Sequence, residues 1–201
     1  MKENKLLVHA CCAPCLTAIY EDIEDNIEEY GLKNKNDFDV IWYNINIHPK
    51  DEYELRKNTL KEFLKIKNKE GIFIDEYDLL NWTKNAVNYK ENGYSIRCEY
   101  CYTSRLEKVF EYAKNNGYTQ VTTSLLISPY QKHDIIIEVC NKLSKKYNVE
   151  FLYKDFRPMF WDGQHRAKEL GLYRQKYCGC IFSIDEGGGK KELVYEKKKN
   201  K

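Results

Sequence analysis

Cysteine is the residue type that carries most of the potential chemistry in this sequence. The chain has eight cysteines in 201 residues, and seven of them fall into three tight groups. The groups are Cys11, Cys12 and Cys15; Cys98 and Cys101; and Cys178 and Cys180. In a reducing compartment, thiols at such short spacing are more often metal ligands or redox centres than structural disulfides. The sequence therefore predicts a metal or redox site built from three separate segments.

The compartment is inferred from the start of the chain. The apolar run Leu6–Val8 is far shorter than the apolar core of a secretory signal, so we expect no signal peptide and a cytoplasmic protein without a membrane partner. Apolar residues make up 42% of the chain and charged residues 32%, which is typical of a soluble globular domain. The net charge of +2 does not by itself predict a polyanionic partner.

The cysteine spacing leaves two metals open. Cys12/Cys15 and Cys98/Cys101 form two Cys-x-x-Cys pairs, which together offer four thiolates to a tetrahedral zinc ion. The pairs lie much farther apart than in compact zinc ribbons, and zinc would leave Cys11 and the third group unexplained. An iron-sulfur cluster accepts cysteines from scattered segments, but one cluster needs only four. With either metal, some of the thiols must serve another purpose.

The sequence Cys178-Gly179-Cys180 suggests that purpose. A disulfide between these cysteines would close a small strained ring, and strained disulfides are more oxidising and more labile than structural ones. Such a pair can store and release two electrons. The alternative is that one or both thiols bind a further metal ion, and both interpretations stay open.

Strands alternate with helices along the chain, which predicts a three-layer α/β fold with a mostly parallel sheet. We expect strands at 6–10, 38–47, 71–77, 118–127 and 149–156, and helices at 14–30, 51–69, 82–90, 99–115 and 131–147. A short helix should follow and end at Gly171. The helical spacing around Cys140 predicts that this lone cysteine is a buried apolar side chain. We expect one domain, 1–185, and a basic, flexible tail, 186–201.

Ligands of such open sheets bind beyond the carboxyl ends of the strands. The first cysteine group follows the first strand, and we expect the other two groups in loops that converge on the same edge. Two related classes of enzyme do not match the sequence of the turn after the first strand. A radical S-adenosylmethionine enzyme needs Cys-x-x-x-Cys-x-x-Cys, but Ala18 occupies the third cysteine position. An ATP pyrophosphatase needs a glycine-rich phosphate loop after the first strand, and HACCAPC has no glycine.

Six sequence blocks carry a resemblance to a known family. They are HACCAPC, NINIHP, CEYCYTSRL, TSLLISPYQKHD, DFRP and LGLYRQKYCGCIFS, in this order from His9 to Ser183. Together they resemble the QueH family of epoxyqueuosine reductases. The resemblance implies an adenine-nucleotide α-hydrolase-like (HUP) fold without an ATP loop. It also implies two-electron removal of the epoxide oxygen of epoxyqueuosine at the wobble position of tRNA, which gives queuosine.

The resemblance further implies cofactors and their ligands. A [4Fe-4S] cluster would be held by Cys11, Cys12, Cys98 and Cys101. An additional iron ion beside the cluster would take Cys15 as a ligand, and the redox-active pair would be Cys178 and Cys180. Cobalamin is not implied, and the electron donor is not identified. The alternative function is a zinc-stabilised RNA-binding module without catalysis.

Three further sets of side chains lie in or near these blocks. Candidate proton donors, each with an equally good packing or capping role, are His9, His48, His133 and Asp134. Four aromatic side chains could stack an unpaired base, although packing in the core is the favoured interpretation. They are Tyr153, Phe156, Phe160 and Trp161. Arginines that could bind phosphate or form surface ion pairs are Arg97, Arg105, Arg157 and Arg174.

Overall fold

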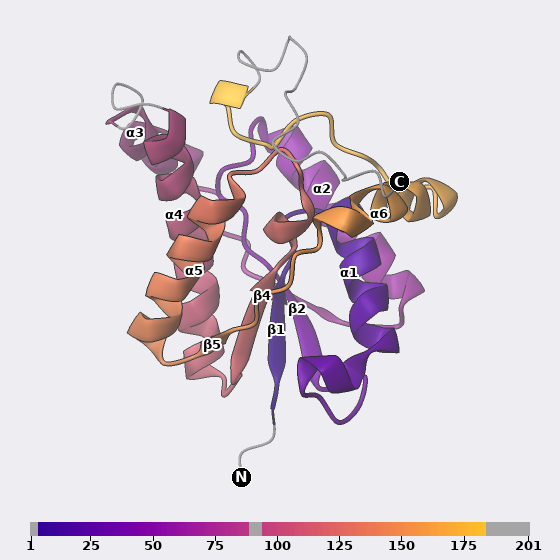
Figure 1. Cartoon of the computed structure of the whole chain (residues 1–201). Helices are drawn as coiled ribbons and strands as arrows, with labels where there is room; N and C mark the ends of the chain where they lie inside the picture. The colour runs from indigo at the N-terminus through magenta and orange to yellow at the C-terminus, as the bar shows by residue number, and fades with distance from the viewer. Residues whose placement is uncertain (1–3, 89–93, 184–201) are drawn as a thin grey trace, which may run out of the picture.

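The computed structural model describes residues 4–88 and 94–183 of the chain and centres on a parallel sheet (Figure 1). The sheet has five strands in the order β3-β2-β1-β4-β5. The strands are β1 (Leu6–His9), β2 (Phe38–Trp42), β3 (Gly71–Phe73), β4 (Gln120–Thr123) and β5 (Glu150–Phe151). Every neighbouring pair runs parallel, with Val8 of β1 between Val40 and Thr122. The predicted parallel α/β fold is therefore confirmed.

Helices cover both faces of the sheet (Figure 1). One layer holds α1 (Ala13–Asp25), α2 (Lys50–Ile66) and α6 (Phe160–Glu169), and the other holds α4 (Tyr94–Asn115) and α5 (His133–Tyr147). The central strand β1 is buried throughout, which is why its sequence LLVH does not alternate between apolar and polar residues. The remaining elements are α3 (Leu79–Asn88) and the short 3-10 helices η1 (Ile27–Tyr30), η2 (Ser124–Ile127) and η3 (Arg157–Met159).

Several elements differ in extent from the sequence prediction. Strand β2 ends at Trp42 and β5 has only two residues, so the chain leaves the sheet earlier than its β-branched and aromatic residues suggest. Helix α4 begins at Tyr94, before the cysteine pair. The expectation of a loop was therefore wrong for Cys98, whereas Cys101 lies in a helix as the predicted range 99–115 has it. Both residues lie in the first turns of α4, where a spacing of three residues places two side chains on one side of a helix.

The contact between α1 and α6 matters for the site. Gly163 of α6 packs so closely on α1 that an added Cβ would lie 2.9 Å from the backbone oxygen of Pro14, and the Thr17 hydroxyl donates to the Gly163 carbonyl at 3.0 Å. The beginnings of α1 and α6 are thereby held together. Cys140 of α5 is fully buried in the core, as predicted.

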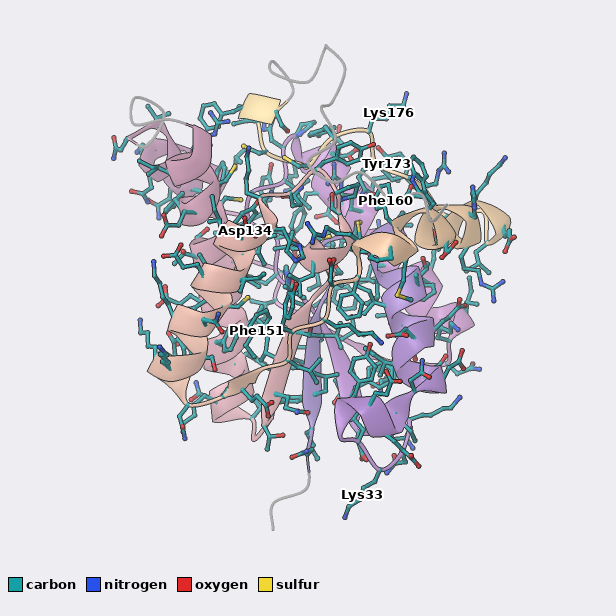
Figure 2. All side chains as sticks on the ribbon, viewed as in Figure 1. Lys33, Asp134, Phe151, Phe160, Tyr173 and Lys176 are labelled. Carbon is teal, nitrogen blue, oxygen red and sulfur yellow. The ribbon has the colours of Figure 1, made fainter. Side chains whose placement is uncertain are left out.

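The carboxyl ends of the strands lie at the top of the molecule in Figure 1, together with α3 and the segment that follows α6. Figure 2 shows Phe160, Tyr173 and Lys176 towards this end and Lys33 at the opposite end. Among residues 4–88 and 94–183, no helix is long and apolar enough to cross a membrane. The predicted domain boundary at residue 185 and the tail 186–201 lie outside the described residues.

Candidate metal centre

The first cysteine group lies at the turn between β1 and α1. Cys12 caps the N-terminus of α1, and its sulfur accepts a hydrogen bond from the Cys15 backbone N–H at 3.3 Å. The sulfur atoms of Cys11 and Cys12 are 3.8 Å apart, and the sulfurs of all three cysteines lie within 4.8 Å of one another. Among the described residues, this is the only group of three or more His, Cys, Asp or Glu side chains that is so closely spaced.

Electrostatics within this group favour a single thiolate. Hydrogen bonds from Cys12 and Cys15 hold the pKa of the Cys11 thiol well below its usual value. The hydrogen bond with Cys11 raises the pKa of Cys15, and burial raises the pKa of Cys12. Cys11 is thus the thiol of the three whose thiolate form is most favoured. Thiolates are the metal-binding form, so a bound cation would displace the remaining protons.

Two side chains from distant segments contact these sulfurs. The Ser124 hydroxyl accepts a hydrogen bond from the Cys11 backbone N–H at 2.8 Å and lies 3.2 Å from the Cys11 sulfur. The side-chain nitrogen of Gln175 lies 2.7 Å from the Cys12 sulfur and 3.7 Å from the Cys15 sulfur. Donors to ligand atoms fix the orientation of the ligands and stabilise their charge.

The other two sets of cysteines lie together, and these four cysteines form the second group of the structure. Cys98 and Cys101 come from α4, and Cys178 and Cys180 come from the segment after α6. Burial raises the pKa of Cys98 to about 11 and that of Cys101 to about 12, and the charges of Cys178 and Cys180 act in the same direction on Cys98. Cys101 and Cys180 pack with Trp82 and Ala86 in one apolar cluster. The convergence of these two sets is therefore as expected.

Within this second group, Cys178 and Cys180 differ in exposure. Both are free thiols in this structure; Cys178 is exposed and Cys180 is buried. Burial raises the pKa of Cys180 to about 12. The pair therefore has one thiol that a partner can reach and one that faces the protein interior.

Hydrogen bonds with the β2–α2 connection and with α2 hold the segment that carries these two thiols. The Tyr177 hydroxyl donates to the His48 carbonyl, and the His48 N–H donates to the Gly179 carbonyl at 2.8 Å. The Arg56 guanidinium donates to the Tyr177 carbonyl at 3.1 Å. Gly179 has a φ of +105°, and a Cβ there would lie 3.0 Å from Ile47. Both its backbone conformation and its surroundings therefore require glycine.

Arg105 of α4 lies between the two groups. Its side chain donates to Asn44 Oδ1, and Asn44 in turn donates to the carbonyl of Ala10 at 2.9 Å. The positive charge of Arg105 acts to lower the pKa of Cys11 in the first group and of Cys101 in the second. The two cysteine groups thus share one buried cation.

The candidate proton donors mostly have structural roles. His9 is fully buried and its ring contacts the Thr123 hydroxyl at 2.8 Å and the Tyr43 carbonyl at 3.2 Å. Burial, reinforced by the charge of Arg105, lowers the pKa of His9 to about 3, so its imidazole is neutral at physiological pH. His133 is buried against Tyr153, and burial lowers its pKa. Asp134 lies in the first turn of α5, where a carboxylate favours the helix.

The fourth candidate, His48, acts mainly through its backbone. It is half-buried, and its Nδ1 is buried without a hydrogen-bond partner among the described residues. Its main chain carries both contacts to the segment of Cys178 and Cys180. His48 is thus the candidate acid that lies nearest to that segment.

The candidate aromatic side chains divide by exposure. Phe156 is fully buried, as core packing predicts, and Phe160 is half-buried. Tyr153 and Trp161 are 48% and 53% exposed, so about half of each side chain is open to solvent. Trp161 stacks edge-on against Phe160 at a centroid distance of 5.1 Å.

The candidate arginines divide in the same way. Arg97 and Arg105 are buried, so their guanidinium groups do not form part of the protein surface. Arg157 forms two hydrogen bonds with the carboxylate of Asp155, at 2.8 and 2.6 Å. Arg174 is exposed, and its side chain reaches the Gln164 carbonyl at 3.4 Å.

Sequence reasoning missed the side chains that connect the segments, namely Gln175, Ser124 and Asn44. Gln175 had a signal, because it lies in the block LGLYRQKYCGCIFS, three residues before Cys178. Ser124 and Asn44 lie in two of the sequence blocks, but their roles depend on which strands are neighbours. The donor set as a whole fits a thiophilic metal, since grouped thiols beside a buried cation suit an anionic metal–thiolate centre.

Comparison with known proteins identifies the family. A model of the family described as epoxyqueuosine reductase QueH matches residues 6–186. The chain belongs to the QueH family. An epoxyqueuosine reductase QueH of Dehalococcoides mccartyi is 36% identical over 186 residues, which cover 92% of this chain and 96% of the relative. The QueH of Thermotoga maritima is 33% identical over 188 residues, which cover 90% and 91%. QueH relatives are named as reductases, so the family is one of oxidoreductases.

Proposed function

We propose that this chain reduces the epoxide of epoxyqueuosine in tRNA to the alkene of queuosine. The supporting observation is that a chain matching the QueH model over residues 6–186 gathers seven thiols in two groups beyond the carboxyl edge of its sheet. The reaction breaks both C–O bonds of the epoxide and forms one C=C bond. It consumes two electrons and two protons and releases water.

The Cys178/Cys180 pair matches this electron count. Oxidation of two thiols to one disulfide releases two electrons and two protons, which is the amount that epoxide removal consumes. Cys178 is exposed, so an external electron donor can reach the pair and reduce it again after each turnover. Cys180 is buried beside Cys101, on the side of the candidate metal centre. We propose this pair as the redox-active cysteines of the site.

The other thiols are proposed as metal ligands. Cys11, Cys12, Cys98 and Cys101 would hold a [4Fe-4S] cluster, and Cys15 would bind an additional iron ion. When bound, such a centre transfers electrons and offers a Lewis-acidic position to the epoxide oxygen. The protein holds Cys11, Cys12 and Cys15 in place through the cap of α1, and Gln175 donates to two of them. Cobalamin has no part in this proposal.

The decisive experiment is anaerobic turnover. Protein reduced with dithionite is incubated with tRNA that contains epoxyqueuosine, and the nucleosides are analysed by mass spectrometry. The expected result is the loss of one oxygen atom and a brown protein with visible cluster absorption. Cys140→Ala is the matched control, because Cys140 is a buried cysteine outside both groups, and it should retain turnover. An unchanged nucleoside mass with several reductants would refute the reductase, and a colourless protein with one zinc per chain would support a zinc-stabilised RNA-binding module.

A further inference from the structure

Arg105 is a buried cation without a carboxylate partner among the residues that the structure describes. Only 3% of it is exposed, and its side chain donates hydrogen bonds to the neutral oxygen of Asn44 and to the Cys101 sulfur, neither of which is a carboxylate. Its Nε is buried and has no hydrogen-bond partner in the described part of the chain. A buried charge without a counter-charge is strongly destabilising, so such a residue indicates that an anionic group belongs beside it.

A second buried arginine shows that this fold can neutralise such a charge. Arg56 is also 3% exposed, and its Nε lies 2.7 Å from a carboxylate oxygen of Glu52, one helical turn away in α2. Arg105 lies one helical turn after Cys101 in α4. At the position four residues before the arginine, α2 therefore has the carboxylate of Glu52, whereas α4 has the thiol of Cys101. The thiols thus take the place that a carboxylate takes beside Arg56.

Arg105 is connected to both cysteine groups. Its charge acts on Cys101 directly, within the second group. On the other side, Asn44 links the guanidinium to the carbonyl of Ala10, which immediately precedes Cys11. The same residue therefore faces the turn that holds the first group and the helix that holds the second.

We propose that Arg105 is a positioning residue whose fixed charge stabilises the more negative, reduced state of the metal–thiolate centre. The proposal rests on the proposed function in one respect, namely that the centre is redox-active. A positive charge close to a redox centre favours the state with one more electron, because burial leaves their attraction poorly screened. Arg105 thus raises the reduction potential and makes the centre easier to reduce.

The test is an anaerobic potentiometric titration of the metal-loaded full chain, followed by its visible absorption. At the potential where the wild-type centre is half reduced, Arg105→Met should lower the ratio of reduced to oxidised centre on the order of tenfold. Arg105→Lys retains the charge and should shift this ratio much less. Leu106→Met, a buried substitution at the next position of α4, controls for disturbed packing and should leave the ratio unchanged.

Each outcome decides the question. An unchanged midpoint in Arg105→Met, or equal shifts in the Met and Lys variants, would overturn the proposal. Loss of metal from Arg105→Met alone supports a requirement for charge, whereas loss from both variants indicates a role in packing and overturns it. The titration needs neither tRNA nor turnover. An unchanged midpoint therefore leaves the reductase intact, a shifted midpoint without turnover refutes only the reductase, and a wild-type protein that binds no metal overturns both.

Discussion

The two cysteine groups are built in different ways. Cys11, Cys12 and Cys15 are placed by the end of a central strand and the first turn of a helix, which are fixed by the fold itself. In the second group, Cys178 and Cys180 lie on a segment without a strand or a long helix, held by contacts to the β2–α2 connection. Secondary-structure elements position ligands more accurately than loops do. The difference indicates that the first group serves to hold a metal.

Within the second group, the segment of Cys178 and Cys180 is suited to exchange, whereas Cys98 and Cys101 lie on helix α4. Cys178 is exposed, whereas Cys12 and Cys15 are buried. A redox pair has to meet an external donor and then face the substrate, and such a task needs access and some freedom of the backbone. We therefore expect substitutions in the first group to reduce metal content and substitutions on the Cys178 segment to reduce turnover per bound metal.

Cys12→Ser should have the largest effect on the metal. Cys12 contributes a sulfur that also contacts Gln175, so its replacement removes a thiolate and the contact that supports it, while a serine can still cap α1. Loss of a supporting contact alone typically weakens metal binding by about 10–100-fold, and loss of a ligand should exceed this range. Iron and sulfide analysis after anaerobic purification measures the effect. Cys140→Ser is the control, and full iron content in Cys12→Ser would contradict a metal-holding first group.

Cys178→Ser should abolish turnover and leave the metal in place. The hydroxyl cannot form a disulfide with Cys180, so the pair can no longer supply two electrons. Visible absorption and iron content should match the wild type, while mass spectrometry should show no loss of oxygen from the tRNA nucleoside. If the variant loses metal as well, Cys178 is a ligand and the distinction between the two groups fails.

The sequence predicted the fold well because the strands and helices are marked by strong local patterns. The run LLVH and the helix at α5 lie where predicted, and Gly171 follows α6 with a φ of +68°. The ends of β2 and β5 were missed because tertiary contacts decide them. Residues after Trp42 continue a β-like pattern, yet Asn44 turns away to donate to the Ala10 carbonyl.

The sequence predicts which thiols could form the site, but it does not predict how they are grouped. Cysteine spacing singles out seven candidate thiols, whereas their distribution over two groups depends on contacts between segments far apart in the chain. Gln175 reaches Cys12, and Arg105 faces the turn before Cys11, through packing that no local pattern encodes. The assignment of each thiol to a cluster, an additional iron or a disulfide stays a prediction.

Gly179→Ala should lower turnover by about tenfold without loss of metal. The substitution places a Cβ 3.0 Å from Ile47 and 3.1 Å from Arg56, in a backbone conformation that costs an L-residue about 1–3 kcal/mol. The segment has to shift, and with it Cys178 and Cys180. Single-turnover rates per bound iron measure the effect. Gly171→Ala is a matched control, because its φ is also positive but nothing lies within 4 Å of an added Cβ.

The smallest effects should come from a matched pair of single hydroxyl deletions. Tyr177 lies on the segment of Cys178, and Tyr177→Phe removes the hydrogen bond from this segment to the His48 carbonyl. Ser124→Ala removes the contacts with Cys11. A hydrogen bond contributes about 1 kcal/mol, so each change should amount to about fivefold. Tyr177→Phe should slow turnover per iron at an unchanged rate of iron loss to a chelator. Ser124→Ala should accelerate iron loss at nearly unchanged turnover per iron. The opposite pattern would mean that the segment of Cys178 holds the metal and the first group carries out the exchange.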